Sequence, residues 1–109
     1  MLDLTVIIPV YNEVKTINKI LKKVHKIKIK KQIIVVDDGS TDASINVIKK
    51  YKSMINKICI HKRNLGKGSA IKTAQKHIKG NYVIIQDADL EYQPKDYLKI
   101  LKILKKKKI

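Results

Sequence analysis

Three short runs rich in valine and isoleucine, each followed closely by acidic residues, constrain the fold of this chain more than any other feature of its sequence. The runs cover residues 4–9, 32–36 and 82–86, and none of them alternates regularly between apolar and polar side chains. Strands that are buried on both faces of a parallel sheet have this pattern. The sequence therefore predicts that all three runs are strands of a parallel sheet.

Segments with helical periodicity lie between these runs. Apolar side chains recur at helical spacing after Asn12-Glu13, which we expect to cap the first helix, after residues 40–42 and after residues 66–68. They are Val14, Ile17, Ile20, Leu21, Val24 and Ile27, then Ala43, Val47, Ile48 and Tyr51, then Ala70, Ile71, Ala74 and Ile78. A fourth, short strand fits residues 57–61.

The end of the chain is predicted to form a last helix. Pro94 is a favoured first-turn residue, and the helix that it opens is expected to turn four side chains inward. These side chains are Tyr97, Leu98, Leu101 and Leu104. Strands and helices then alternate along the chain, which favours an α/β fold: an open, mostly parallel, Rossmann-like sheet with flanking helices.

The chain is strongly basic, with 25 Lys and Arg residues against 9 Asp and Glu residues and a net charge of +16. Only Arg63 is an arginine, whereas the readout of bases and the clamping of phosphates favour arginine. We therefore expect no specific nucleic-acid binding, and a surface of solvated lysines. A diffuse attraction to polyanions or anionic lipid headgroups stays open.

Composition excludes other classes of protein. Hydrophobic residues make up 44% of the 109 residues, too many for a disordered chain, and no apolar run approaches the ~18 residues of a membrane span. The single cysteine, Cys59, excludes an internal disulfide framework and a cysteine-based zinc site, and we expect it in the core. We expect a cytoplasmic protein.

The placement of the acidic residues is more informative than that of the lysines. Eight of the nine follow one of the three apolar runs: Glu13, then Asp37, Asp38 and Asp42, then Asp87, Asp89, Glu91 and Asp96. Ligands of open α/β sheets bind at the carboxyl ends of the strands. The preference of aspartate for turns and caps explains Asp42 and Asp96 well, but Asp87 and Asp89 poorly. The acids therefore predict a ligand site at this edge of the sheet.

Asp87 and Asp89 are two positions apart on an extended segment, so their carboxylates point to the same side. Two carboxylates held together repel each other unless a cation lies nearby. A small number of hard oxygen ligands suits Mg²⁺ or Mn²⁺, completed by water and phosphate oxygens. The pair therefore predicts a site for a metal and a diphosphate, with both residues as metal ligands.

Residues 64–69 are predicted to open a helix whose free backbone N–H groups face an anion. Arg63 and Lys67 are candidates for compensating the charge of a diphosphate. A plain turn and helix cap explains Gly66 and Gly68 equally well. The histidines show no ligand spacing and are expected to be surface or half-buried side chains: His25, His61 and His77.

Four motifs give the chain a resemblance to a known family. They are Pro9-Val10-Tyr11-Asn12-Glu13, Val36-Asp37-Asp38-Gly39-Ser40-Thr41-Asp42, Asn64-Leu65-Gly66-Lys67-Gly68 and Asp87-Ala88-Asp89-Leu90-Glu91. In this order and spacing they resemble the signatures of glycosyltransferase family 2, and within it most of all the dolichyl- or polyprenyl-phosphate sugar synthases. The resemblance implies a GT-A fold, a GDP- or UDP-sugar donor and a divalent metal, Mg²⁺ or Mn²⁺.

The resemblance also implies residues that bind the nucleotide. Pro9, Tyr11 and Glu13 would border the donor nucleotide, and Val36 and Asp38 would meet its base and ribose. Two alternatives stay open. Asp38 can instead shape the turn that follows it, and Tyr11 can be an aromatic lid on the edge of the sheet.

The last motif is implied to hold the sugar-diphosphate end of the donor. Asp87, Ala88 and Asp89 would hold the ribose, the diphosphate and the metal, with Asp89 the favoured metal ligand. Glu91 also belongs to the donor site, and it stands where many members of the family have glutamine, which adds a charge near the metal.

The reaction that the resemblance implies is an inverting, metal-assisted transfer of the sugar to an acceptor such as polyprenyl phosphate. The catalytic residue is unknown, because the family's acceptor half, with its usual base, follows the motifs present here. We expect residues 1–109 to be the N-terminal, donor-binding part of a family 2 domain, at the cytoplasmic membrane face, with a separate acceptor domain or membrane partner. The alternatives are a truncated, non-catalytic fragment that binds nucleotide sugars and, less favoured, a basic module that binds polyanions or lipid surfaces.

Overall fold

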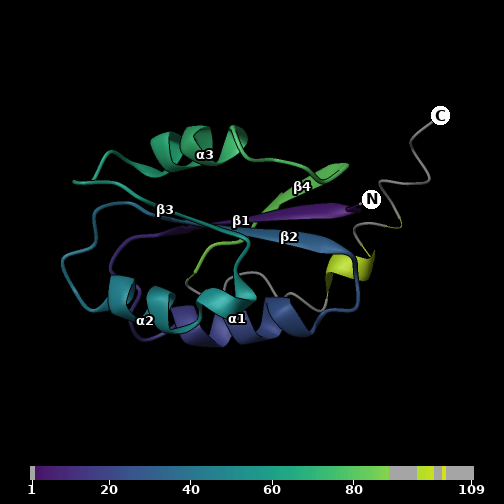
Figure 1. The fold of residues 1–109 in the computed structure, drawn as a ribbon, viewed down its shortest axis with the longest axis horizontal. Coiled ribbons are helices and arrows are strands. Elements are labelled where there is room, and N and C mark those ends of the chain that lie inside the picture. Colours follow the sequence, from purple (N-terminus) through teal and green to yellow (C-terminus); the bar gives the residue numbers. More distant parts are fainter. Residues whose placement is uncertain (1, 89–95, 100–101, 103–109) are drawn as a thin grey trace.

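The computed structural model describes residues 2–88, 96–99 and 102, which form a sheet with helices on both faces (Figure 1). The elements are β1 Leu4–Val10, α1 Ile17–Lys26, β2 Lys31–Asp37, α2 Ser44–Lys50, the 3₁₀ turn η1 Lys52–Met54, β3 Lys57–Ile60, α3 Lys67–Gln75 and β4 Tyr82–Ile85. All four strands are parallel and lie in the order β3-β2-β1-β4. The predicted α/β fold is confirmed, and each strand begins and ends within one residue of its predicted bounds.

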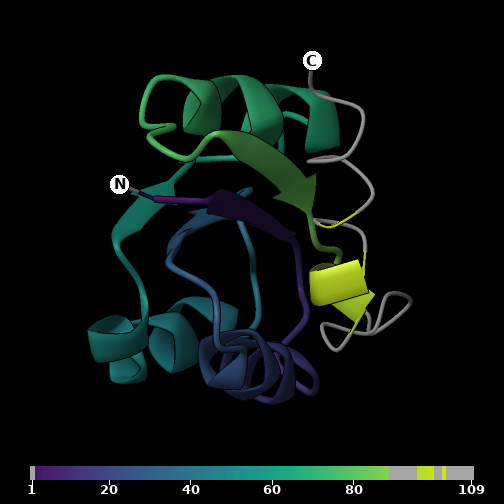
Figure 2. The same cartoon turned by 90° about the vertical axis from the view of Figure 1, so that its right-hand side faces the viewer.

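Helices α1 and α2 cover one face of the sheet and α3 covers the other (Figure 2). Successive residues of β1 alternate between the two layers. Val6 and Ile8 pack in the core on the side of α1, whereas Ile7 packs in a second core with Ala70 and Ala74 of α3. Both faces of the central strands are therefore buried, which is why their runs are apolar without alternation.

The order of the strands leaves one edge of the sheet open to a ligand. From β1 the chain steps through α1, β2 and α2 to β3 on one side, and α3 then carries it back to β4 on the other side of β1. Where connections diverge in this way, a crevice forms outside the carboxyl ends of the strands. The topology therefore opens the edge where the acidic residues cluster.

The start of α1 differs from the prediction. The helix begins at Ile17, so the expected cap by Asn12-Glu13 is wrong. Asn12 instead adopts a φ of 52°, which asparagine tolerates better than most residues. Its Oδ1 accepts hydrogen bonds from the backbone N–H groups of Thr41 (2.8 Å) and Asp42 (3.2 Å). Asn12 therefore joins the loops that follow β1 and β2, beside the open edge.

Part of the predicted last helix lies within the described residues. Tyr97 is buried, as expected, and its hydroxyl donates a hydrogen bond to Oε1 of Gln86, just after β4. The inward orientation predicted for Leu98 is wrong: it is 47% exposed, because neighbouring helical residues are turned by about 100° from each other. Pro94, Leu101 and Leu104 lie outside the described residues. Within the described part of the chain, no helix has the length and hydrophobicity of a membrane-spanning segment.

Candidate functional site

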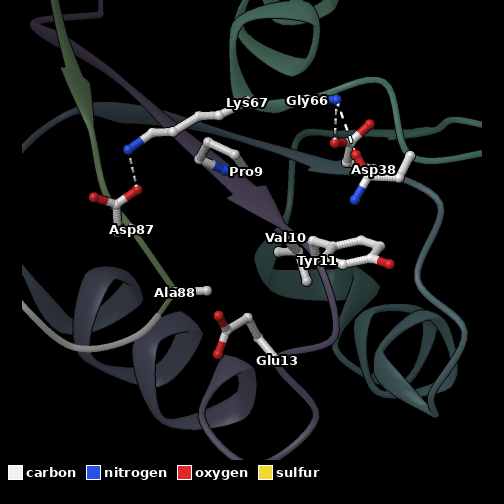
Figure 3. A pocket seen from close by; sticks show the side chains of 10 residues that line it. Pro9, Val10, Tyr11, Glu13, Asp38, Gly66, Lys67, Asp87 and Ala88 are labelled. Carbon is white, nitrogen blue, oxygen red and sulfur yellow. Dashed lines mark hydrogen bonds and ion pairs between the residues drawn. The ribbon is translucent and has the colours of Figure 1, made fainter.

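A cavity of about 320 Å³ opens at the carboxyl ends of β1, β2 and β4 (Figure 3). The strand ends and the loop before α3 supply its walls: Pro9, Val10, Tyr11, Glu13, Asp38, Asn64, Gly66, Lys67, Asp87 and Ala88. The structure thus gathers most of the side chains proposed for the donor: Pro9, Tyr11, Glu13, Asp38, Lys67, Asp87 and Ala88. Their contact with a donor stays a prediction.

Four other proposed residues are not placed at the cavity. Asp89 and Glu91 lie outside the described residues. The side chain of Val36 is fully buried in the core on the side of α3, so it does not form a cavity wall. Arg63 is exposed and also forms no wall.

The two adjacent aspartates at the end of β2 have different roles. Asp37 is buried, and its Oδ2 accepts a hydrogen bond from the Ser40 N–H (2.9 Å), so Asp37 shapes the turn. The sequence left this turn-shaping role open as an alternative for Asp38, and the structure gives it to Asp37. Asp42 accepts a hydrogen bond from the Ser44 N–H (2.8 Å), and because the N-cap of α2 is Ala43, Asp42 shapes the turn just before this helix.

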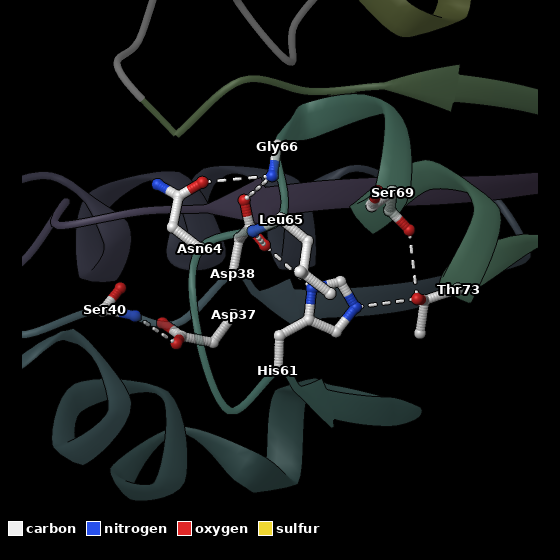
Figure 4. Close-up of polar contacts among 9 residues, drawn as sticks. All are labelled: Asp37, Asp38, Ser40, His61, Asn64, Leu65, Gly66, Ser69 and Thr73. Atoms are coloured by element: carbon white, nitrogen blue, oxygen red, sulfur yellow. Dashed lines mark hydrogen bonds and ion pairs between the residues drawn. The ribbon is translucent and has the colours of Figure 1, made fainter.

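Asp38 connects the end of β2 to the loop before α3 (Figure 4). Its Oδ1 accepts hydrogen bonds from Nδ1 of His61 (2.8 Å) and the Leu65 N–H (2.9 Å), and its Oδ2 accepts one from the Gly66 N–H (2.8 Å). Burial alone would raise the pKa of Asp38, but these hydrogen bonds and the charge of His61 together hold that pKa below its usual value. Asp38 is therefore an ionised carboxylate at neutral pH.

The sequence did not reveal Val10 and Asn64 as cavity walls, nor His61 as a partner of Asp38. The Nδ1 of His61 lies 2.8 Å from Asp38 Oδ1, and its Nε2 lies 2.8 Å from Oγ1 of Thr73 on α3. Spacing along the sequence gave no sign of these contacts, because the partners are 23 and 12 positions away. One signal was present: His61 directly follows β3, at the same edge of the sheet as the acidic residues.

The loop before α3 differs in one respect from the predicted anion site. Gly66 has a φ of 98° and precedes the helix, as a turn-and-cap glycine does. Its N–H is bound to Asp38, so this group is not free to bind an anion. Lys67, the first residue of α3, does reach the cavity.

Lys67 and Asp87 form an ion pair across the cavity, with 2.5 Å between Nζ and Oδ1 (Figure 3). Mg²⁺ is commonly held by one or two carboxylates together with substrate phosphates and waters. Asp87 supplies one such carboxylate, although Lys67 already pairs with one of its oxygens. No group of three metal-ligating side chains is assembled within residues 2–88, 96–99 and 102. Asp87 therefore offers one carboxylate oxygen, and its chemistry fits a divalent metal that is also held by the phosphates of a ligand.

Comparison with known proteins identifies the family. Residues 5–109 match the profile of the glycosyl transferase family 2. An undecaprenyl-phosphate 4-deoxy-4-formamido-L-arabinose transferase of Edwardsiella ictaluri is 35% identical over 100 residues, which cover 84% of this chain and 30% of that protein. The chain thus matches a part of a longer relative.

Two solved structures have a similar fold. S. aureus TarS 1-349 in complex with UDP-GlcNAc gives a TM-score of 0.80 at 30% identity, over 93% of this chain and 30% of that one. The mannosyltransferase PcManGT from Pyrobaculum calidifontis, in complex with GDP-Man and Mn²⁺, gives a TM-score of 0.73 at 28% identity. This match covers 82% of the present chain and 30% of PcManGT. The present chain spans less than half the length of each of these proteins and shares the Rossmann-like GT-A fold over that part. With four ordered motifs and a family match over nearly all of its sequence, the chain belongs to glycosyl transferase family 2.

Proposed function

We propose that the cavity binds a GDP- or UDP-linked sugar donor for transfer of the sugar to an acceptor such as polyprenyl phosphate. The observation that carries this proposal is the assembly of Tyr11, Asp38, Lys67 and Asp87 around one opening at the carboxyl edge of the sheet. The complexes of the similar S. aureus and Pyrobaculum proteins with UDP-GlcNAc and GDP-Man support it.

Each of these groups suits one part of such a donor. A carboxylate has about four acceptor positions, and Asp38 uses three of them, so its Oδ2 can accept one more hydrogen bond from a base N–H or a ribose hydroxyl. The partly exposed ring of Tyr11 offers an apolar face to the base. The cation of Lys67 attracts the diphosphate. Asp87, and Asp89 as predicted from the sequence, would hold the divalent metal.

The proposed reaction is an inverting displacement at the anomeric carbon. A bound Mg²⁺ or Mn²⁺ would supply charge neutralisation for the departing nucleoside diphosphate. Lys67 contributes a further positive charge there, and Asp38 and Tyr11 orient the nucleoside. A polyprenyl phosphate is already anionic, so it needs little help from a general base. We place the acceptor site outside the described residues and the enzyme at the cytoplasmic membrane face, where lysines attract anionic headgroups.

Calorimetric titration with UDP and GDP, with and without Mn²⁺, tests the proposal. We expect metal-dependent binding that Asp87→Asn weakens by about tenfold, the usual scale for a lost charge-assisted contact. Asp96→Asn makes the same change of charge at an exposed residue that forms no cavity wall, and should bind like the wild type.

Three results would separate the alternatives. Binding without sugar transfer or donor hydrolysis would favour the non-catalytic fragment. Binding with a steep salt dependence that Asp87→Asn leaves unchanged would favour the basic polyanion module. No nucleotide binding at millimolar concentration would contradict the proposed function.

A further inference from the structure

His61 lies between the end of β2 and α3 and contacts both (Figure 4). Its side chain is 10% exposed and that of Asp38 is 5% exposed, so water does not compete strongly for the bond between them. The His61 backbone N–H also donates to the carbonyl oxygen of Asp37 (2.8 Å). The imidazole is therefore held in one place, next to a carboxylate that lines the cavity.

The partners of His61 determine the role of its Nδ1. Asp38 is ionised and can only accept, so Nδ1 donates to Asp38 Oδ1. On the other side of the ring, Nε2 shares a hydrogen bond with the Thr73 hydroxyl (2.8 Å), which also lies 3.0 Å from the Ser69 carbonyl oxygen. His61 is therefore joined to the end of β2 by one hydrogen bond and to α3 by another.

The hydrogen bond from Nδ1 determines the orientation of the Asp38 carboxylate. With Oδ1 held by His61, the carboxylate also accepts the N–H groups of Leu65 and Gly66, the two residues directly before Lys67. A single imidazole thus supports both ends of the cavity: the carboxylate at the end of β2, and the turn from which Lys67 reaches Asp87.

We propose that His61 is a positioning residue for the nucleotide. It acts through Asp38, which it orients toward the nucleoside, and through the turn at Leu65 and Gly66, which sets the position of Lys67 at the diphosphate. This inference rests on the proposed function, because the ligand that it positions is the donor nucleotide.

Two variants of His61 separate its two hydrogen bonds. The amide nitrogen of asparagine takes nearly the place of Nδ1, so His61→Asn keeps a donor for Asp38 and loses the contact with Thr73. Glutamine places its amide near Nε2, so His61→Gln keeps the contact with Thr73 and loses the one with Asp38. Each variant replaces the ring by an amide and removes one of the two hydrogen bonds, which makes the pair matched.

Two measurements test these variants. The first is the affinity for UDP and GDP in the presence of Mn²⁺, and the second is the rate of hydrogen exchange at the Leu65 and Gly66 amides without nucleotide. We expect His61→Gln to weaken binding by about tenfold and to accelerate exchange at both amides, because a hydrogen bond to a charged group is lost. His61→Asn should stay within about twofold of the wild type in both, in line with the loss of an uncharged hydrogen bond away from the cavity.

The two measurements test separate parts of the proposal. Equal effects of both variants, or unchanged exchange in His61→Gln, would overturn the role of His61. Faster exchange with unchanged nucleotide affinity would overturn its link to the nucleotide. A wild-type chain that binds no nucleotide contradicts the proposed function, while the exchange rates still decide whether His61 holds the turn.

Discussion

Gly39 lies at the turn after the aspartate pair, where the backbone has a φ of 76°. A Cβ at this position would lie 2.3 Å from the Arg63 carbonyl carbon and 2.5 Å from the Asn64 nitrogen. We expect Gly39→Ala to destabilise the protein by at least about 2 kcal/mol, because strain and a backbone clash add up. Urea denaturation measures the change.

Gly68 provides the matched control for Gly39. It lies in the first turn of α3, and a Cβ there would have no neighbour within 4 Å. Gly68→Ala should therefore stabilise the protein by about 0.4–1 kcal/mol, because alanine restricts the unfolded chain and favours the helix. Equal effects of the two substitutions would contradict the close packing of Gly39 on the loop before α3.

Asp38 makes the stability depend on pH at acid values. Its pKa is lowered in the folded protein, so it contributes stability above the ordinary aspartate value of about 3.9, and this contribution is lost as the pH falls toward the folded pKa. We expect Asp38→Asn to be less stable at pH 7 and to lose less stability between about pH 5 and pH 3 than the wild type. Parallel curves of unfolding free energy against pH would contradict this.

At the scale of elements, the strands were predictable and the helix starts were not. A run such as 33–36 is apolar because two layers bury it, and that information is local. The start of α1 depends instead on Asn12, whose side chain bonds to the loop after β2, 29 and 30 positions away. No local pattern contains such a contact, so the capping preference of asparagine gave the wrong helix start.

A buried polar cluster fixes the connection from α3 to β4. The Thr5 hydroxyl donates to Gln32 Oε1 (2.8 Å) and accepts the Gly80 N–H (2.8 Å), and Gln32 Oε1 also accepts the Lys79 N–H (2.9 Å). Thr5→Val keeps the shape and leaves the Gly80 N–H without this acceptor. We expect a loss of about 1–3 kcal/mol and faster hydrogen exchange at Gly80. Unchanged exchange at Gly80 would show that the cluster does not hold the connection.

At the scale of the whole molecule, the cavity lies where ligands of parallel sheets bind, at the carboxyl ends of the strands, and this position follows from the sequence pattern. The pattern places Glu13, Asp38 and Asp87 at one edge, and all three form walls of the cavity. It does not determine which side chain faces outward: Val36, which the family resemblance suggested for the donor, has its side chain in the core. It also missed His61, because the donors around a carboxylate come from other strands and helices.

The net charge of +16 and the acidic residues at the strand ends predict different modes of nucleotide binding. If lysines govern binding, a nucleotide is held wherever cations are dense, and the affinity falls steeply with salt. If the cavity governs binding, a nucleotide contacts a small set of residues at the ends of β1, β2 and β4 and at the start of α3. The location of the bound nucleotide distinguishes the two.

A two-dimensional amide NMR titration with UDP and GDP, in the presence of Mg²⁺, measures that location directly. The account predicts saturable shifts concentrated at Tyr11, Gly66, Lys67 and Ala88, and their loss in Asp87→Asn but not in Asp96→Asn. Shifts spread over the lysine-rich surface, or shifts that Asp87→Asn leaves unchanged, would contradict the claim that this cavity is the nucleotide site.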